Sequence, residues 1–413
     1  MSISVSNIPG GYRISLPVQR VEFEARRFAD DRRTQSTTTE LTVVSKDPAA
    51  QGHLHRARLN LTSTTGKTDF ARALTRYDDS VRWIDVVENV ANALLDAHRT
   101  GEPVVMIGGE RPISNAVKYV IWPMCPDNAS TILFGDGGTG KSMIALLCGY
   151  LVQTGGSHVG LRTEQRNVLY LDYETCEDVM HMRLAAIAAG VNGPLPQMGY
   201  RFCYHPLADD VEALQDVIRQ YQVGFIIVDS LGLAAGGDPS DPEIAIRMMG
   251  ALRELRCPSL LVDHVSKMDN GGKPTPFGSV YKPNLARSTW FAKLGQRDSQ
   301  NVTRVALHNR KANFGPLRPA MGLELTFEGS EERLDRLAFR RFDVLTSDDD
   351  GLVEDASYAD RIAAVVVHGA KTVKTIAEET GIKEGMVSQS MRRQAFRFQK
   401  LPDGRWGLKE RAS

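Results

Sequence analysis

The stretch Gly135-Asp136-Gly137-Gly138-Thr139-Gly140-Lys141-Ser142 decides the fold class of this 413-residue chain. It matches the pattern G-x-x-x-x-G-K-S in full. An apolar run, Thr131 to Phe134, leads into it, and Met143 to Tyr150 follow with the pattern of a helix. A strand, a glycine-rich loop and a helix in this order form a phosphate-binding loop, in which backbone N–H groups and the helix N-terminus surround the phosphates. The alternative is a glycine-rich turn that matches by chance.

Two side chains give this loop its expected chemistry. The ammonium group of Lys141 is expected to bridge the β- and γ-phosphates, and the Ser142 hydroxyl to ligate Mg²⁺. The sequence therefore predicts a protein that binds and hydrolyses a nucleoside triphosphate, with ATP and Mg²⁺ as its cofactors.

A second metal ligand is expected at the end of another buried strand. The run Phe225-Ile226-Ile227-Val228 leads to Asp229, and ligands bind at the carboxyl ends of such strands. We expect Asp229 to hold Mg²⁺ directly or through water. The alternative is an aspartate that only begins a loop.

Hydrolysis also needs a group that orients the attacking water. Many P-loop ATPases place a glutamate directly after the metal-side aspartate, but this chain has Ser230 there. The apolar run Val168 to Leu171 ends at Asp172-Tyr173-Glu174, and we favour Glu174 as the base. The alternative is that Glu174 caps the following helix.

Residues 106–345 alternate apolar strand candidates with helix candidates. Such alternation predicts an α/β domain whose mostly parallel sheet is covered on both faces. Strands are expected at Thr131–Gly135, Val168–Tyr173, Phe225–Ser230 and Ser259–His264, helices at Lys141–Thr154, Glu177–Ala189, Asp209–Tyr221 and Asp241–Arg256, and antiparallel strands from Val302 to Phe342.

The two ends of the chain differ from this middle part in the pattern of their apolar and charged residues. Residues 1–105 predict an α+β accessory or oligomerisation domain, with strands at His55–Leu61 and Thr68–Tyr77 about a turn at Thr64–Lys67, and a helix at Val81–His98. Residues 346–357 form an acidic linker.

Residues 358–413 predict three helices, at Ala359–His368, Val373–Thr380 and Lys383–Ala395, and then a β-hairpin. This order resembles a winged helix-turn-helix domain. From Tyr358 onward eleven Lys/Arg stand against six Asp/Glu, a net charge of +5, which suits duplex DNA. Winged helices also serve as protein contacts, and a solvated helix face is the alternative for Arg392 and Arg393. The candidate DNA contacts are Ser388, Gln389, Arg392, Arg393, Arg397, Lys400 and Arg405.

The P-loop, Glu174 after the following strand and Asp229-Ser230 after a later strand resemble the RecA superfamily. The resemblance is greatest to the RepA-like hexameric ATPases of plasmids and phages, an AAA-type group, and extends from about Pro103 to Phe327. It implies a RecA-like P-loop fold and a ring, with each site completed by a neighbouring subunit. The chain departs from the short plasmid enzymes in its large terminal additions.

The resemblance also implies roles for residues after the later strands. His264 would sense the γ-phosphate, the alternative being a structural histidine. Arg287 would act as an arginine finger on the neighbour's nucleotide, the alternatives being a structural or a cis-acting arginine, and Lys311 would be a second trans-acting cation. The segment Lys267–Pro283 would face single-stranded DNA through Lys267, Lys273 and Lys282, or be a solvated surface loop.

Composition narrows the class of protein further. Lys plus Arg equals Asp plus Glu, 50 each, so any signal for nucleic acid must be local. The five cysteines are odd in number and widely spaced, which is typical of reduced thiols in the cytoplasm. We see no secretory signal and no apolar stretch long enough to cross a membrane.

The leading hypothesis is an ATP-driven DNA motor, a hexameric replicative helicase of a phage, plasmid or other mobile element. The alternatives are a regulatory ATPase that assembles on an origin or operator without translocation, and a recombinase-like filament.

Overall fold

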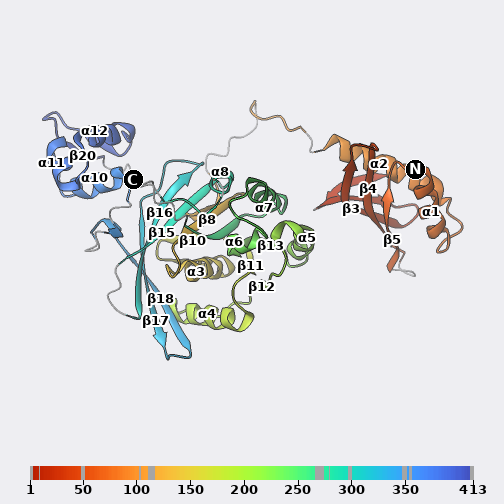
Figure 1. Ribbon diagram of the computed structural model, residues 1–413, viewed down its shortest axis with the longest axis horizontal. Coiled ribbons are helices and arrows are strands. Elements are labelled where there is room, and N and C mark those ends of the chain that lie inside the picture. Colours follow the sequence, from red (N-terminus) through yellow and green to blue (C-terminus); the bar gives the residue numbers. More distant parts are fainter. Residues whose placement is uncertain are drawn as a thin grey trace. The chain divides into compact units, whose positions relative to one another are not determined.

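The computed structural model describes residues 3–8, 10–47, 52–101, 104–109, 117–265, 274–278, 280–295, 300–346, 351–352 and 356–409. The chain divides into two compact units, residues 1–114 and 115–413. The division lies nine residues beyond the boundary predicted between 105 and 106. Figure 1 shows the elements of each unit.

The first unit is an antiparallel sheet with two helices packed on one face. Alternate residues of β4 (Ser36–Ser45) are buried, because one face of the strand packs on the helices while the other meets solvent. The solvent face carries ion pairs such as Arg13–Glu24, at 2.7 Å. The strand order is β1-β2-β3-β4-β5, with β1 Ser4–Ile8, β2 Gly11–Leu16, β3 Val21–Asp31 and β5 Gly52–Asn60, and the second helix is α2, Trp83–Thr100.

The first helix of this unit corrects a sequence prediction. Residues Thr64–Thr75 form α1, where a turn and a strand were expected. The Ser63 hydroxyl accepts a hydrogen bond from the Gly66 N–H at 3.1 Å, which caps the helix. Phe70 and Leu74, one helical turn apart, are both buried. This cap and this apolar spacing outweigh the high threonine content, which favoured a strand.

The second unit is built on a nine-stranded sheet of order β12-β11-β13-β14-β8-β15-β16-β17-β18. The pairings from β12 to β15 are parallel, and those from β15 to β18 are antiparallel, as the sequence predicted. The strands are β8 Ser130–Gly135, β11 Asn167–Asp172, β12 Gly199–Phe202, β13 Val223–Asp229, β14 Ser259–His264, β15 Ser288–Leu294, β16 Val302–Ala312, β17 Met321–Gly329 and β18 Leu334–Phe342.

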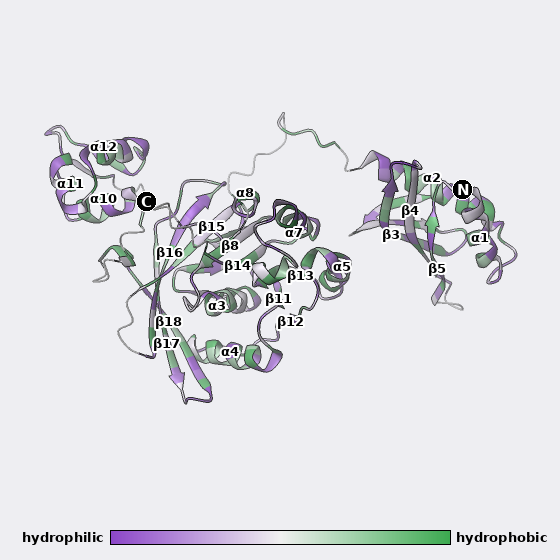
Figure 2. Ribbon diagram, in the orientation of Figure 1, coloured by the Kyte–Doolittle hydropathy of each residue, from purple (hydrophilic) through white to green (hydrophobic). Residues whose placement is uncertain are grey.

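Helices cover both faces of the parallel part of the sheet, and each face has its own apolar core. Figure 2 shows the apolar strands enclosed between the helices. At the end of α4, Gly190 lets the helix approach β18, since a Cβ there would lie 1.8 Å from the Leu337 carbonyl oxygen. One face is covered by α3 (Lys141–Thr154) and α4 (Glu177–Gly190), the other by α5 (Val211–Gln220), α6 (Leu231–Ala234) and α7 (Pro242–Glu254).

Short elements connect or flank the large sheet. A small sheet of order β7-β6-β10-β9 packs beside α3. Among the described residues, no helix is both long enough and apolar enough to span a bilayer. The short elements are β6 Tyr119–Trp122, β7 Cys125–Pro126, β9 Ser157–His158, β10 Leu161–Thr163, η1 Leu207–Asp209, α8 Tyr281–Leu285 and η2 Val344–Thr346.

The last part of the second unit contains three helices and a hairpin, in the predicted order. Ser357 caps α10 and Thr372 caps α11, each through its hydroxyl. Four apolar residues of these helices and their connections, Ile376, Ile382, Val387 and Met391, are all buried. The elements are α10 Tyr358–Val366, α11 Val373–Thr380, α12 Glu384–Arg393, β19 Phe398–Lys400 and β20 Trp406–Leu408.

Candidate nucleotide-binding site

The glycine-rich loop connects β8 to α3, as the sequence predicted. Gly138 and Gly140 have φ values of 75° and 76°, a left-handed conformation that glycine adopts without steric cost. Gly140 is the N-cap of α3, so the loop ends on a helix N-terminus. Asp136 and Gly137 are exposed, and nothing lies within 4 Å of a Cβ built on Gly137. The loop therefore opens outward where phosphates would bind.

Lys141 lies against the loop that precedes it. Its ammonium group donates to the carbonyl oxygens of Gly135 at 2.9 Å and Asp136 at 2.7 Å. Burial lowers the pKa of Lys141, and the charge of Asp229 opposes that shift. An ammonium group held beside the loop in this way suits the phosphate chain of a nucleotide.

The two predicted magnesium ligands lie together. The Ser142 hydroxyl lies near enough to the Asp229 carboxylate to lower its pKa, and the Tyr170 hydroxyl donates to Asp229 Oδ2 at 2.6 Å. Burial raises the pKa of Asp229, while the hydroxyl groups of Tyr170 and Ser142 oppose the rise. A carboxylate and a hydroxyl oxygen side by side next to a phosphate loop suit Mg²⁺, which binds protein oxygens together with substrate phosphates. Tyr170 carried no signal in the sequence because its role depends on the neighbouring strand.

Two acidic side chains lie at the end of β11 and just after it, Asp172 and Glu174, and they have different surroundings. Asp172 is buried, and its carboxylate accepts hydrogen bonds from the backbone of Glu174 at 2.9 Å and of Thr175 at 3.1 Å. It also accepts from the hydroxyls of Thr175 and of Tyr200. Glu174 is exposed, and its charge acts on Lys141. Asp172 therefore shapes the turn that presents Glu174, and the choice of Glu174 as the base stays a prediction.

His264 ends β14 beside the loop, where its Cα pairs with that of Gly135. Its side chain is exposed. The preceding residue, Asp263, is fully buried. Adjacent residues of a strand face opposite sides of the sheet. Leu261 packs in the core beneath α7, whereas Val262 packs in the core beneath α3, so Asp263 faces the α7 side and His264 the α3 side.

Arg287 lies at the other end of the sheet. It immediately precedes β15, and its N–H donates to the Ser130 carbonyl oxygen at the start of β8 at 3.1 Å. The six residues of β8 place its two ends about 17 Å apart. The exposed Arg287 side chain is therefore far from the loop of its own subunit. This position excludes the cis-acting alternative.

Lys311 has a structural role in the described conformation. Its ammonium group donates to three carbonyl oxygens at the end of α8, those of Pro283 at 2.8 Å, Asn284 at 2.9 Å and Ala286 at 2.8 Å. An ammonium group has three donors, and all three are used here. The expectation of Lys311 as a second trans-acting cation is therefore not supported by its contacts.

The three lysines expected to contact single-stranded DNA have different outcomes. Lys267 and Lys273 lie outside the described residues. The prediction for Lys282 is wrong in this structure, because its side chain is fully buried and forms an ion pair with Asp263 at 3.2 Å. A lysine in a segment rich in proline and glycine reads as a surface residue, and its partner lies 19 residues earlier in the chain.

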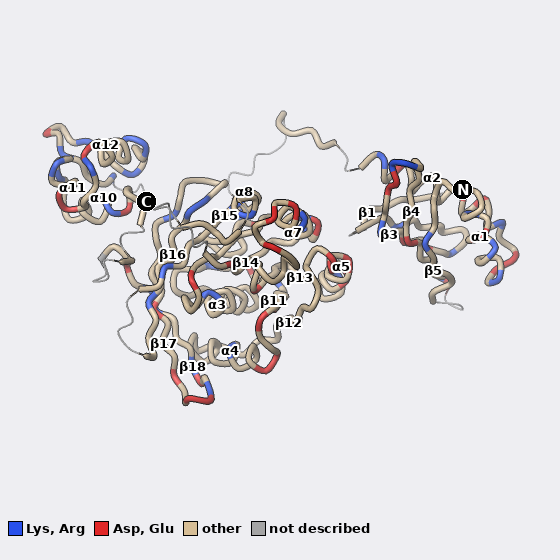
Figure 3. The backbone as a smooth tube through the Cα atoms, viewed as in Figure 1, with Lys and Arg blue, Asp and Glu red and all other residues tan. Residues whose placement is uncertain are grey.

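The candidate duplex contacts also separate into two groups. Gln389, Arg392 and Arg393 are exposed on α12, where Figure 3 shows basic residues, while Ser388 is half-buried and Lys400 is exposed on β19. Arg397 pairs with the buried Asp360 at 2.6 Å, and Arg405 donates to Asp403 at 2.7 Å. These two guanidinium groups are engaged within the fold, so the exposed α12 residues remain the better candidates.

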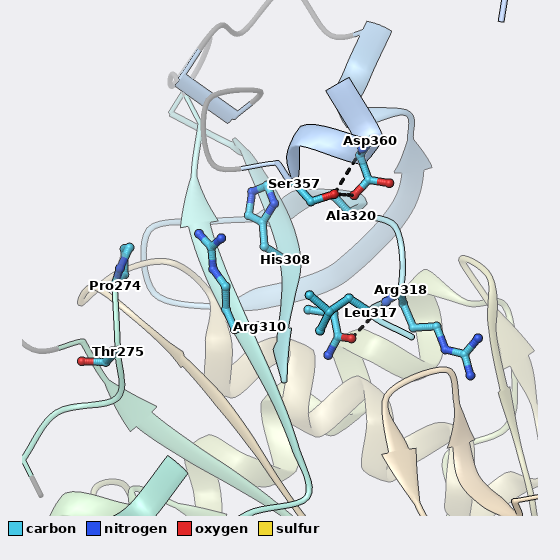
Figure 4. A pocket seen from close by; sticks show the side chains of 10 residues that line it. Pro274, Thr275, His308, Arg310, Leu317, Arg318, Ala320, Ser357 and Asp360 are labelled. Carbon is cyan, nitrogen blue, oxygen red and sulfur yellow. Dashed lines mark hydrogen bonds between the residues drawn. The ribbon is translucent and has the colours of Figure 1, made fainter. Parts of the chain in front are cut away.

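A hollow of about 230 Å³ lies beside the end of β16 that is near Arg287. Figure 4 shows Arg310 and His308 from β16 at its wall, with Ser357 and Asp360 from the start of α10. No motif pointed to this hollow, because its wall combines segments far apart in the sequence. Two of its residues, Asn309 and Arg318, also line a small crevice with Arg287.

The comparisons with known proteins agree with the nucleotide site. Residues 98–270, less than half of the chain, match the family described as AAA domain. No curated protein matches the chain. Among solved structures, the chain is similar to a KaiC-like protein from the hyperthermophilic archaeon Pyrococcus horikoshii, with 14% identity, a TM-score of 0.36, and 54% of this chain and 93% of that chain covered. That likeness is too distant to inform on activity.

The fold and the site define a class. A glycine-rich loop of the P-loop pattern between β8 and α3, the neighbouring oxygens of Ser142 and Asp229, and the match to an AAA domain make the second unit a P-loop ATPase domain with an α/β fold built on a large, mostly parallel sheet.

Proposed function

We propose that the protein is a ring-forming, ATP-driven DNA motor of the RepA-like type, a hexameric replicative helicase of a mobile element. One observation carries this proposal: the nucleotide loop and Arg287 lie at opposite ends of β8, and both Arg287 and the loop residues Asp136 to Gly138 are exposed. A subunit that binds its nucleotide at one end of β8 and exposes a guanidinium group at the other end can complete the nucleotide site of a neighbouring subunit.

Such contacts are heterologous, because a different surface of each subunit takes part. Repeated heterologous contacts close into a ring or continue as a filament. The arginines around the hollow in Figure 4 add positive charge near Arg287, where the neighbour's phosphates would lie. Arg287 would stabilise the negative charge on the transferring phosphoryl group.

Within each site, the residues of this chain bind and orient the reactants. Lys141 and the loop amides would hold the phosphates, and Ser142 and Asp229 would hold Mg²⁺, which neutralises phosphate charge when bound. Glu174 would accept a hydrogen bond from the attacking water. His264, next to the loop, would respond to the γ-phosphate and couple it to the segment after β14, which would contact single-stranded DNA.

The C-terminal helices and hairpin have the order of a winged helix. In the proposed function, the exposed face of α12 contacts duplex DNA or a replication partner through Gln389, Arg392 and Arg393. This module also favours the second candidate function, a regulatory ATPase that assembles on an origin or operator without moving along DNA.

The first experiment measures steady-state ATP turnover with and without single-stranded DNA, together with unwinding of a forked duplex. Stimulation by single strands and unwinding support the motor. Turnover that ignores single strands, with no unwinding, supports the regulatory ATPase instead.

A mixing experiment tests the shared site. Arg287→Ala and Lys141→Ala proteins should each be inactive, because one lacks the finger and the other lacks the phosphate-binding lysine. Mixed one to one, about a quarter of the interfaces combine an intact loop with an intact Arg287, so turnover should return to about a quarter of the wild-type value. An inactive mixture, with co-assembly verified by native mass measurement, overturns the trans role of Arg287.

A further inference from the structure

A buried ion pair joins the strand that ends at His264 to the helix that precedes Arg287. The side chains of Asp263 and Lys282 are both fully buried, with the ammonium nitrogen 3.2 Å from Asp263 Oδ2. Lys282 also donates to the Phe277 carbonyl oxygen at 3.1 Å. A buried ion pair adds little net stability compared with apolar packing, but its directional contacts fix the position of the groups that carry it.

Asp263 lies at the nucleotide end of the sheet, where β14 ends. Asp263 Oδ1 accepts a hydrogen bond from the N–H of His264 at 2.9 Å, and His264 pairs with Gly135 of the loop. The His264 carbonyl oxygen accepts from the Phe277 N–H at 2.7 Å. The charge of Asp263 also acts on Lys141. If His264 engages a phosphate as proposed, a shift of the end of β14 would therefore also move Asp263 on the other face of the strand.

Lys282 belongs to α8. The residues at the C-terminal end of α8 are held at the opposite end of the sheet, where β8 and β15 begin. Lys311 binds the last carbonyl oxygens of α8, and the Ala286 N–H donates to the Lys282 carbonyl oxygen at 3.1 Å. Arg287 follows directly, and its carbonyl oxygen accepts from the Asn313 N–H at 3.0 Å. In this way α8 connects the nucleotide end of the sheet to the Arg287 end.

We propose that Asp263 and Lys282 are positioning residues that couple the nucleotide state of one subunit to the placement of its Arg287 in the neighbour's site. This inference rests on the proposed trans role of Arg287. The ion pair transmits the position of β14 to α8, and the Lys311 cap keeps α8 rigid up to Arg287. Neither side chain touches a nucleotide.

Two double variants remove the ion pair without leaving a buried charge. Asp263→Asn with Lys282→Met removes the connection to α8 and leaves an amide that still accepts from His264. Asp263→Asn with Lys282→Gln keeps hydrogen bonds between the two introduced amides and to the Phe277 carbonyl oxygen, and so preserves more of the connection if the first variant folds poorly. The matched control is Asp127→Asn with Arg166→Gln, which removes a half-buried ion pair of 2.8 Å that does not involve α8.

The variant Asp263→Asn with Lys282→Met (the Asn/Met variant) should bind ATP as the wild type does but hydrolyse it slowly. A misplacement of about 1 Å costs on the order of a hundredfold in rate, so we expect a fall of about a hundredfold in kcat with little change in KM. The Asn/Gln variant should lose less, and the control pair should keep wild-type turnover.

Two mixtures separate positioning of Arg287 from damage to the variant's own nucleotide site. Mixed with Glu174→Gln protein, which still binds nucleotide and keeps the ion pair, the Asn/Met variant offers an intact loop to a correctly placed Arg287, and about a quarter of wild-type turnover should return. Mixed with Arg287→Ala protein, it offers only its misplaced Arg287, and turnover should stay low. The reverse pattern means that the ion pair serves the subunit's own loop, and it overturns the inference.

Other outcomes are equally decisive. Wild-type turnover by the folded Asn/Met variant overturns the inference, because the connection would then be dispensable. The mixture of Arg287→Ala with Glu174→Gln protein serves as the reference. If that reference stays inactive in verified mixed assemblies, the proposed trans site fails; if it is active while the Asn/Met variant is rescued by neither partner, only the coupling fails.

Discussion

Replacing Asp172 tests which of the two acidic groups at the end of β11 takes part in hydrolysis. In Asp172→Asn, Oδ1 can still accept from the backbone of Glu174 and Thr175, and Nδ2 can donate to the hydroxyl oxygens of Thr175 and Tyr200, each of which can also accept. The turn should therefore survive, with unfolding free energy and kcat near the wild-type values.

Asp172→Ala removes all four hydrogen bonds. At about 1 kcal/mol for each bond, the unit should lose about 4 kcal/mol of stability, which corresponds to a fall of roughly 6 °C in its thermal midpoint. Glu174 would lose the turn that presents it, so kcat should also fall. Glu174→Gln is the matched substitution, and it should stop hydrolysis while nucleotide binding remains.

Thermal unfolding and steady-state ATP turnover of the three variants provide the readout. The reasoning is refuted if Asp172→Asn loses hydrolysis as severely as Glu174→Gln while it unfolds at the wild-type temperature. That result would make Asp172 the acid that acts on water.

Three further predictions concern the same unit. Lys141→Ala should abolish ATP turnover, and retained activity would mean that the loop is not the catalytic site. Burial raises the pKa of Asp229, so its protonation favours the folded state. Without Mg²⁺, the melting temperature of the Asp229→Asn protein should therefore exceed that of the wild type at pH 8, and this difference should shrink toward pH 4. A difference in melting temperature that does not change with pH contradicts this. Thiol labelling at pH 8 should modify Cys176 first, as intact mass and Cys176→Ser would show, because Cys176 is exposed. Burial raises the pKa of the other thiols, to about 11 for Cys203, to about 12 for Cys148 and Cys257, and well above its usual value for Cys125. Fast labelling of any of these four cysteines would contradict this effect of burial.

The elements around the nucleotide loop could be predicted because their signals are local. Helix α3 has the predicted bounds, Lys141–Thr154, since the loop fixes its start and Gly155 its end. Strand β14 also has the predicted bounds, Ser259–His264. Parallel strands buried on both faces leave long apolar runs, and their polar ends mark the edge where ligands bind.

The features that escaped prediction depend on tertiary contacts or on competing local signals. Lys282 reads as a solvated residue because its partner, Asp263, becomes a neighbour only when α8 packs on the sheet. Tyr170 reads as an apolar strand residue, yet its hydroxyl supports Asp229 on the adjacent strand. In α1, the threonines favoured a strand, while the Ser63 cap and the burial of Phe70 and Leu74 decided for a helix.

The separation of Arg287 from the loop along β8 has a consequence for stoichiometry. Under the proposed arrangement every open chain of subunits has one terminal loop that no arginine completes, so a pair has one working site and only a closed assembly has as many sites as subunits. Specific activity should therefore rise with protein concentration and level off only when the ends of the chain meet.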